Sequence, residues 1–363
     1  MYLAVAAIGM SIAALPALAA PPLYHLTDLG TLGGSSSAGN GINSFGYVTG
    51  SALTAGDSAK HAFLYTNTMQ DLGTLGGSNS FGFSVNDSKV VAGTSDTTGN
   101  AGKHAFRYDT TMHDLGTLGG KESQGYGINA SNVVTGSSYI SGNTAQHAFR
   151  YDTSMHDLGT LGGNSSIGYS INSSGTVAGY SDTVGSAAKH AFVYDTSIHD
   201  LGTLGGSNSY GYAINDSGGV TGSSQIAGNG ATHAFRYDTS MHDLGTLGGT
   251  LSEGLGINSS GTVVGYSSLS DPNTFHAFYF DNALYDLNSL LDSSGAGWTL
   301  VQAIDINNDG DITGHGLFNG QDHAFLLAPG IGQQAVTPEP GTLGLCFGLG
   351  VAGLFAYRRF RRA

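Results

Sequence analysis

The residues best suited to chemistry in this chain are its 13 histidines, and most of them recur at a fixed spacing. A histidine can ligate a metal ion, and His104 and His113, nine residues apart in one repeat, could come close together. Equivalent residues of a regular repeat would be too far apart to share an ion, so structural or interfacial histidines are favoured over metal ligands. Seven begin a His-Ala-Phe tripeptide and four precede an aspartate: His61, His104, His147, His190, His233, His276 and His323, and His113, His156, His199 and His242.

One segment resembles the start of a calcium-binding loop. Asp305, Asn307, Asp309 and Asp311 place oxygen ligands at alternate positions around a glycine bend. The acidic residue needed at the twelfth place is missing, because Gly316 stands there. The segment also coincides with a turn of the repeat described below. Calcium is therefore a secondary hypothesis, and we expect no other cofactor and no other metal site.

Residues that could form a catalytic centre do not stand out. The chain has no Gly-x-Ser-x-Gly, Walker or Rossmann pattern in a strand-to-helix context. Two of the three glutamates, Glu122 and Glu253, lie at loosely corresponding places three repeats apart, with no sign of a paired acid and base. An enzyme would need titratable residues that depart from the repeat consensus and converge from several repeats. The near-identity of the repeats over 104–232 argues against that, so we predict a protein that is not an enzyme.

The elements that position these residues repeat every 43 residues. Such a period indicates a supersecondary unit that buries its apolar face only by stacking on its neighbours. Besides His-Ala-Phe, three further sequence features recur seven times each, and we call them the marks of the repeat. They are an Asp-Leu pair at Asp28, Asp71, Asp114, Asp157, Asp200, Asp243 and Asp286; an asparagine at Asn43, Asn86, Asn129, Asn172, Asn215, Asn258 and Asn307; and a glycine at Gly50, Gly93, Gly136, Gly179, Gly222, Gly265 and Gly314.

One repeat, residues 104–146, predicts four short strands. The alternation of His104-Ala-Phe-Arg-Tyr108 indicates the first, and Met112–Leu115 the returning strand. After a glycine-rich link, Tyr126–Asn129 and Val133–Gly136 read as the third and fourth. Four strands in 43 residues, seven times, predict an all-β, seven-bladed propeller over residues 23–328, with a β-solenoid as the alternative. His104, Phe106, Asp114, Asn129 and Gly136 are then expected to be structural.

The turns allow finer predictions. The Asn-x-x-Gly spacing, as in Asn172 to Gly175, indicates a type I turn whose glycine takes a positive φ. Lys89 occupies that glycine place in its copy and should be the least comfortable one. If Tyr108 lies opposite His113, Arg107 lies opposite Asp114, a favourable pair of charges. Other copies lack the arginine, so we expect the repeat aspartates to cap backbone donors of the glycine-rich turn.

The two ends of the repeat region predict a shared closing blade. The region opens without a preceding His-Ala-Phe and finishes with a lone His323-Ala-Phe strand, so three N-terminal strands and one C-terminal strand would complete one blade. This would remove exposed sheet edges. The last repeat carries an insertion of six residues and the only tryptophan, Trp298. The insertion is expected to seal the ring, with an aromatic platform for a sugar or another ligand as the alternative.

Both termini carry apparent targeting signals. Residues 1–19 are almost uninterruptedly apolar and end in Ala17-Leu-Ala19, which resembles a signal peptide with a small-residue cleavage site, although the basic n-region is missing. A buried first strand is the alternative. The single cysteine, Cys346, excludes an intrachain disulfide.

The C-terminus predicts a membrane segment after a linker over 329–337. Residues 341–357 are uncharged and just long enough to span a bilayer as a helix. A basic cluster follows, which favours a cytoplasmic end over the alternative of a buried core helix. The segment 338–363 thus has three parts: the tripeptide Pro338, Glu339 and Pro340, the apolar span, and the arginines Arg358, Arg359, Arg361 and Arg362.

Two families share these features. The segment 338–363 resembles the PEP-CTERM sorting signal of Gram-negative bacteria in all three of its parts. The His-Ala-Phe repeats, with Asp-Leu-Gly-Thr-Leu-Gly-Gly after each of the first five, resemble the HAF family of extracellular repeats over roughly 23–328, although the last copy departs with Asp286-Leu-Asn-Ser-Leu. The PEP-CTERM resemblance implies transient inner-membrane anchoring, recognition by an exosortase-type enzyme, cleavage near Pro338-Glu339-Pro340, and delivery to the cell surface or an exopolysaccharide matrix.

The net negative charge of the chain limits the classes of partner that it could bind. The formal net charge is −14, and outside the four terminal arginines only 8 of the 12 Lys and Arg remain against 26 Asp and Glu. This excess disfavours nucleic acid and anionic membrane surfaces. The most variable stretches, 54–60, 138–146 and 225–232, precede His-Ala-Phe strands and should be surface loops where binding varies.

We therefore predict an exported, non-enzymatic protein of the cell surface or extracellular matrix that binds polysaccharide or a surface protein through its loops. The alternatives are a carbohydrate-active propeller enzyme, either a hydrolase or a lyase, and a periplasmic binding module that depends on metal or calcium.

Overall fold

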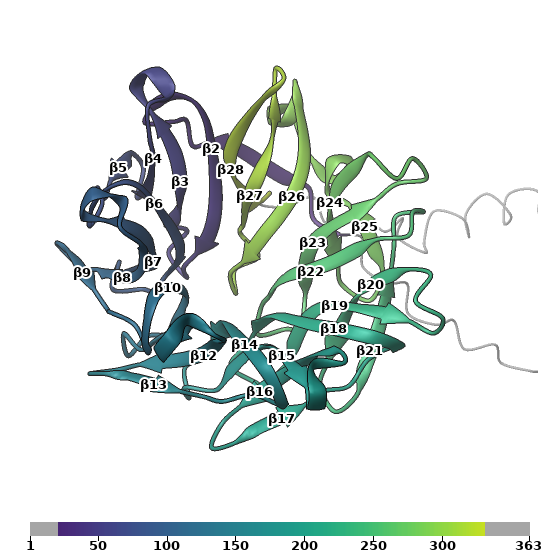
Figure 1. The fold of residues 1–363 in the computed structure, drawn as a ribbon. Coiled ribbons are helices and arrows are strands. Elements are labelled where there is room, and N and C mark those ends of the chain that lie inside the picture. The colour runs from purple at the N-terminus through teal and green to yellow at the C-terminus, as the bar shows by residue number, and fades with distance from the viewer. Residues whose placement is uncertain (1–20, 331–363) are drawn as a thin grey trace, which may run out of the picture. The chain divides into compact units, whose positions relative to one another are not determined.

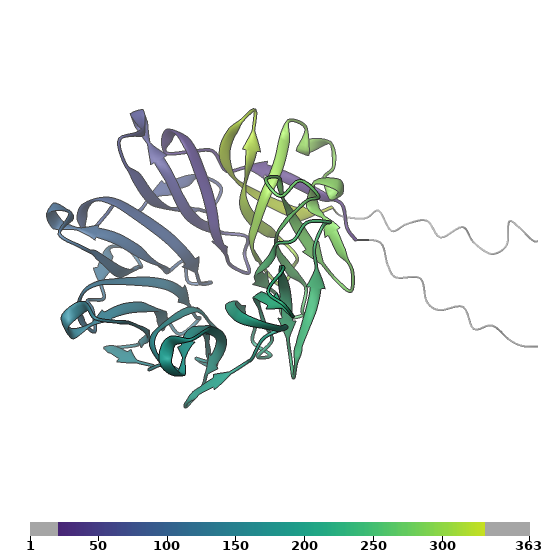
Figure 2. The ribbon, with the colours of Figure 1, turned by 45° about the vertical axis from the view of Figure 1, so that its right-hand side comes forward.

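Seven four-stranded antiparallel sheets are arranged in a ring around a central opening in the computed structural model, which describes residues 21–330 (Figures 1 and 2). Residues Leu23–Pro329 form one compact unit. The chain is therefore an all-β, seven-bladed propeller, as the repeats predict. Within residues 21–330 no helix is long and apolar enough to cross a membrane.

Each blade runs from an inner strand beside the opening to an outer strand at the rim. The inner strands are β2 (Gly33–Ile42), β6 (Gly76–Val85), β10 (Gly119–Ile128), β14 (Gly162–Ile171), β18 (Gly205–Ile214), β22 (Ser252–Ile257) and β26 (Trp298–Ile306). The second strands are β3 (Val48–Thr54), β7 (Val91–Thr97), β11 (Val134–Ile140), β15 (Val177–Thr183), β19 (Val220–Ile226), β23 (Val263–Ser268) and β27 (Ile312–Phe318).

The third strands, which carry His-Ala-Phe, are β4 (Lys60–Tyr65), β8 (Lys103–Tyr108), β12 (Gln146–Tyr151), β16 (Lys189–Tyr194), β20 (Thr232–Tyr237), β24 (Phe275–Phe280) and β28 (Gln321–Pro329). The outer strands are β5 (Met69–Asp71), β9 (Met112–Asp114), β13 (Met155–Asp157), β17 (Ile198–Asp200), β21 (Met241–Gly245), β25 (Leu284–Asp286) and β1 (Tyr24–Asp28). Short 3₁₀ turns are η1 (Ala55–Asp57), η2 (Thr98–Asn100), η3 (Ser141–Asn143), η4 (Val184–Ser186), η5 (Leu287–Leu290) and η6 (Ser293–Gly295).

The core lies between blades rather than within them. One buried cluster joins Ala105 and Leu115 of one blade to Ile128, Val134 and Phe149 of the next. The phenylalanine of every His-Ala-Phe tripeptide is completely buried in this way. Each blade thus covers the apolar face of its neighbour, which explains why a single repeat could not fold alone.

The closing blade has the strand order β1-β28-β27-β26, so it takes one strand from the N-terminus and three from the C-terminus. The prediction of a shared blade is confirmed, but the predicted division of three and one is wrong. The Asp-Leu strand follows the His-Ala-Phe strand within one blade, so Asp28 completes the blade of His323, 3.0 Å from its Nδ1. The marks at Asn43 and Gly50 already belong to the next blade. Tyr24, the first residue of β1, pairs with Pro329, the last residue of β28.

The six-residue insertion lies against this closing strand. The backbone N–H of Asp292 donates to the carbonyl of Tyr24 over 3.0 Å, and the N–H of Leu26 donates to Ser294 Oγ over 2.7 Å. Trp298 stacks on Phe318 with the ring centroids 5.1 Å apart, and it packs against the buried core of this blade. These contacts are those of a segment that seals the ring.

Two local predictions need correction. Arg107 pairs with His113, and Asp114 pairs with Phe106, so the expected Arg107–Asp114 pair does not form. The reason is the turn: Asp109 Oδ1 accepts from the N–H groups of Thr110 and Thr111, so the loop holds three residues instead of the expected four. β9 begins at Met112 as predicted, but Tyr108 pairs with Met112 and not with His113. The third strand of the repeat is also longer than predicted, because β10 begins within the glycine-rich link.

Lys89 takes the left-handed conformation at a turn where five other copies have glycine with positive φ. Its φ is 64°, against 86° for Gly175. Such a conformation costs an L-residue about 1 kcal/mol. We expect the unfolding free energy of the Lys89→Gly variant to be about 1 kcal/mol higher than that of the Lys89→Ala variant, as measured by urea denaturation. Both variants lose the contact of Lys89 Nζ with the Tyr47 ring, 4.9 Å away, so their difference isolates the backbone.

The matched position for this comparison is Ser88, the preceding residue, which has no positive φ. At Ser88 the glycine variant should be less stable than the alanine variant, because glycine relieves no strain there and only raises the conformational entropy of the unfolded chain. An alanine variant at Lys89 as stable as the glycine variant would contradict the assigned strain.

Candidate functional site

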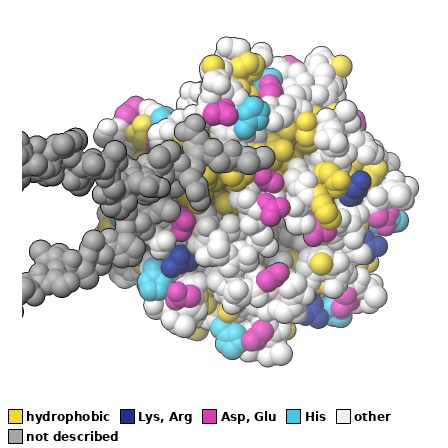
Figure 3. Space-filling model, turned by 180° about the vertical axis from the view of Figure 1, so that it is seen from behind, with side chains coloured by type: hydrophobic (Ala, Val, Ile, Leu, Met, Phe, Trp, Pro, Cys, Tyr) yellow, Lys and Arg dark blue, Asp and Glu magenta, His cyan; other side chains and the backbone are white. Residues whose placement is uncertain are grey.

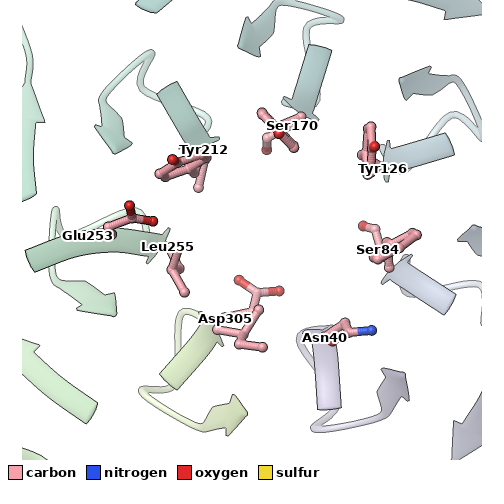
Figure 4. A pocket seen from close by; sticks show the side chains of 13 residues that line it. Asn40, Ser84, Tyr126, Ser170, Tyr212, Glu253, Leu255 and Asp305 are labelled. Carbon is pink, nitrogen blue, oxygen red and sulfur yellow. The ribbon is translucent and has the colours of Figure 1, made fainter. Parts of the chain in front are cut away.

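A cavity of about 390 Å³ lies inside the ring and is lined by residues of all seven inner strands. This volume falls in the range of roughly 300–1,000 Å³ that is usual for small-molecule sites. Figure 4 shows the labelled residues around the opening, with the Asp305 carboxyl directed toward its middle. The cavity is lined by Asn40, Phe83, Ser84, Tyr126, Gly127, Tyr169, Ser170, Tyr212, Ala213, Glu253, Leu255, Ile304 and Asp305.

Seven of these lining residues are equivalent, because each lies three positions before the repeat asparagine of its blade. The residue type at this place changes from polar through aromatic to aliphatic around the ring. In order they are Asn40, Phe83, Tyr126, Tyr169, Tyr212, Leu255 and Ile304.

The four aromatic residues come from consecutive blades and touch one another in a row. The ring centroids are 5.3 Å apart from Phe83 to Tyr126, 5.0 Å from Tyr126 to Tyr169, and 5.4 Å from Tyr169 to Tyr212. These are ordinary distances for aromatic pairs. We call Phe83, Tyr126, Tyr169 and Tyr212 the aromatic arc.

Further rings support the arc from behind. Tyr180 packs on Tyr169 with the centroids 5.9 Å apart, and on Tyr210 at 4.9 Å. Lys189 Nζ lies 5.5 Å from the centroid of the Tyr180 ring and 2.5 Å from Asp182 Oδ1. This aromatic cluster therefore already holds one protein cation, paired with a carboxylate.

Two carboxyl groups lie on the part of the ring that the arc leaves free. Glu253 is on β22 and Asp305 on β26, in adjacent blades. Burial raises the pKa of Glu253, against the opposing effect of the Tyr266 and Tyr212 hydroxyls. Burial also raises the pKa of Asp305 to about 6, although its oxygens accept from the N–H groups of Ile42 and Ile306. Both side chains are half-buried, because they face the open channel.

The tyrosines of the arc stay protonated at neutral pH. Burial raises the pKa of Tyr126 to about 12 and raises those of Tyr169 and Tyr212 further. None of the 13 lining residues is Lys or Arg. The channel thus offers aromatic faces, neutral hydroxyls and two carboxyl groups that no lining cation compensates.

The seven repeat asparagines form a closed circle at one end of the channel, where two smaller hollows open. The Nδ2 of Asn129 donates to the carbonyl of Asn172 in the next blade, and the same bond recurs in every blade until Asn307 donates back to Asn43, with distances from 2.8 to 3.3 Å. Each Oδ1 accepts from the backbone of its own turn, as Asn129 does from Val133. All seven asparagines are buried, so they hold the blades together.

The histidines of the seven tripeptides pair with the repeat aspartates. His104 Nδ1 lies 2.9 Å from Asp114, and the equivalent distances in the other six blades are 2.7 to 3.0 Å. Asp114 Oδ1 also accepts from the N–H of Gly116 over 2.8 Å, the capping role predicted for these aspartates. Figure 3 shows imidazoles beside acidic side chains on one face of the molecule.

His104 and His113 do not come together. His113 Nε2 lies 3.1 Å from Asp109, on the opposite face of the strand pair from Asp114, because neighbouring residues of a strand point to opposite sides. Over residues 21–330 no three His, Cys, Asp or Glu side chains are grouped so that they could hold a metal ion. In the calcium-like segment, Asp305 faces the channel, while Asn307 Oδ1 accepts from the N–H groups of Asp309 and Asp311 in the turn.

The residues of the two predicted targeting signals lie outside the described part of the chain. These are the expected cleavage positions Ala17 and Ala19, and the sorting residues Pro338, Glu339, Pro340, Arg358, Arg359, Arg361 and Arg362.

The aromatic arc and Asp305 as a channel residue are missing from the sequence-based predictions. The signal was present: three positions before each repeat asparagine, the residue type varies although the asparagine itself is the same in every copy. Its meaning depends on knowing that this strand is the innermost one.

Comparisons with known families match two parts of the chain. The family described as "Protein of unknown function (DUF3466)" matches residues 202–331, and the PEP-CTERM protein-sorting motif matches residues 336–362. No curated protein matches the sequence.

Among solved structures, the chain is similar to the β-propeller domain of the Trilobed protease from Pyrococcus furiosus, described as having an open velcro topology. The identity is 13%, the TM-score is 0.50, and the match covers 68% of this chain and 82% of that one. TolB from Acinetobacter baumannii matches with 11% identity and a TM-score of 0.38, over 79% of this chain and 80% of that one. The likeness to the β-propeller domain of the Trilobed protease supports the fold of this chain and says nothing of its function.

Proposed function

We propose that this protein is exported, anchored transiently in the inner membrane of a Gram-negative bacterium, and sorted by an exosortase-type enzyme to the cell surface or extracellular matrix. The observation that carries the proposal is the sorting motif matched over residues 336–362, directly after the propeller unit ends at Pro329. Such a motif implies an exported protein that passes through the membrane.

At the surface, the propeller acts as a binding protein of the HAF repeat type for polysaccharide or another surface protein. The variable loops support this role, since 54–60, 138–146 and 225–232 include many exposed residues beside rigid strands.

A carbohydrate-active enzyme is the second candidate, because Glu253 and Asp305 depart from the repeat consensus and face the channel from adjacent blades. Release of reducing ends from a polysaccharide, abolished by Glu253→Gln, would favour the enzyme over the binding protein.

Replacement of Pro338, Glu339 and Pro340 by alanine is expected to block processing, because the sorting enzyme would lose its recognition sequence. Mass spectrometry of the intact protein from cell envelope and medium should then show an uncleaved C-terminus in the inner membrane. The unaltered protein should appear at the surface or in the medium without its C-terminal segment.

The matched control replaces Gly332, Gln333 and Gln334, which precede the matched motif, by alanine. This variant should be processed normally. An unaltered protein that keeps its full C-terminus in the inner membrane would overturn the sorting proposal.

A further inference from the structure

The channel has an asymmetric lining that the repeat alone does not require. The aromatic arc occupies four consecutive blades, and the carboxyl groups of Glu253 and Asp305 occupy the following two. We propose that the channel is a binding site for an organic cation, namely a quaternary ammonium group or a protonated amine. The site is distinct from the outer loops, so it does not depend on the surface function proposed above.

The aromatic arc supplies the attraction for the cation. The face of an aromatic ring is negative, and several such faces around a cation form the usual site for alkylammonium groups. The rings of the arc are half-buried, in mutual contact and open to the cavity. Lys189 over the Tyr180 ring shows the same pairing within the protein itself, one layer behind the arc.

The carboxyl groups supply the charge. Each is half-buried in the ring without a lining Lys or Arg. Hydrogen bonds from neighbouring N–H and hydroxyl groups offset part of the cost of removing a carboxylate from water, and a nearby cation would offset more of it. The raised pKa values of Glu253 and Asp305 reflect that cost. A cation bound against the arc would share the cavity with both carboxyl groups and would lower the cost of ionising them.

Other ligand classes fit less well. An anion would meet two carboxyl groups and no lining cation. A neutral sugar could stack on the rings, but it would leave the carboxylates uncompensated. An amine-bearing sugar and an alkylammonium compound share the chemistry that the channel offers, so the test must separate these two sources.

The test is isothermal titration calorimetry of the full-length chain in detergent at pH 7.5, with choline, glucosamine, N-acetylglucosamine and glucose as probes. Choline or glucosamine should bind with one site per chain and a Kd on the order of 1 mM or lower. N-acetylglucosamine and glucose should not bind detectably. Preference for choline would identify an alkylammonium site, and preference for glucosamine an amino-sugar site.

Variants locate the site. Tyr169→Leu and Glu253→Gln should each weaken binding of the cationic probe roughly tenfold, because each removes one source of attraction. Glu122→Gln removes the same charge outside the lining and should leave binding unchanged. Melting curves for all variants separate lost binding from lost folding.

The pH dependence of cation binding gives a second readout. Asp305 is neutral below its pKa of about 6 and charged above it, so cation affinity should rise between pH 5 and pH 7. Asp305→Asn should flatten that part of the profile; Glu253 and the three tyrosines are the other titratable groups of the lining.

The proposal would be overturned by the absence of saturable binding of both cationic probes, by equal binding of N-acetylglucosamine, or by binding that Tyr169→Leu and Glu253→Gln leave unchanged.

Discussion

Deletion of residues 23–28 opens the ring and lowers the unfolding free energy by at least about 5 kcal/mol. The deleted segment contains β1, whose Tyr24 and Leu26 are buried at 1% and 6% exposure in the closing blade. Its loss leaves β28 as an unpaired edge, which invites association between chains. Urea denaturation and size-exclusion chromatography with light scattering measure both effects.

Two further samples make this result interpretable. Leu23→Ala changes a residue that is 45% exposed beside the same strand, and it should leave stability and mass unchanged. A synthetic peptide of residues 22–30, added to the deletion variant, should restore the monomer by occupying the place of β1. A deletion variant that remains monomeric with an unchanged melting curve would show that the ring does not depend on this strand.

Gly136→Ala is expected to destabilise the propeller by about 3 kcal/mol. A Cβ atom there would overlap the carbonyl oxygen of Gln124 on β10 and press against the Phe149 ring on β12. Both are fixed, because the carbonyl belongs to the inner strand and Phe149 is completely buried between two blades. The loss should appear in urea denaturation as a lower midpoint with an unchanged slope.

Gly230→Ala is the matched control. Gly230 lies in an exposed loop and has no positive φ, and no atom lies within 4 Å of the place that a Cβ would occupy. Alanine there should change the unfolding free energy by no more than about 0.5 kcal/mol. Equal effects of the two substitutions would mean that the close approach at Gly136 does not limit stability.

The blade architecture could be predicted because each recurring residue of the repeat makes one contact that every blade needs. The phenylalanine of His-Ala-Phe fills the space between blades, Asn129 links its turn to the next one, and Gly136 admits the neighbouring strand and ring. Such contacts recur in every blade, so they impose the same residue at the same spacing.

The errors arose where the sequence leaves strand order or loop length open. Periodicity shows that strands alternate with turns, but it does not show where one blade ends and the next begins. The predicted division of the closing blade is therefore the wrong way round. The register of Arg107 depends on a turn one residue shorter than expected, which Asp109 enforces by accepting bonds from its two successors.

The channel was harder to predict for a different reason. Tyr126 appears in the sequence as one aromatic residue of a strand, and nothing in one repeat distinguishes an inward-facing position at the centre from one buried between blades. Glu253 and Asp305 become neighbours of the arc only when seven blades close. The site belongs to the ring as a whole, so no single repeat encodes it.

The pairing of Tyr24 with Pro329 has a consequence for how the gene could be rearranged. The first and last strand residues lie side by side, so a short linker could join them and new termini could be opened in an exposed turn of another blade. Such a circular permutant would keep every contact between blades. It would also attach residues 336–362, which match the sorting motif, to another blade, and thereby test whether sorting depends on the blade that carries them.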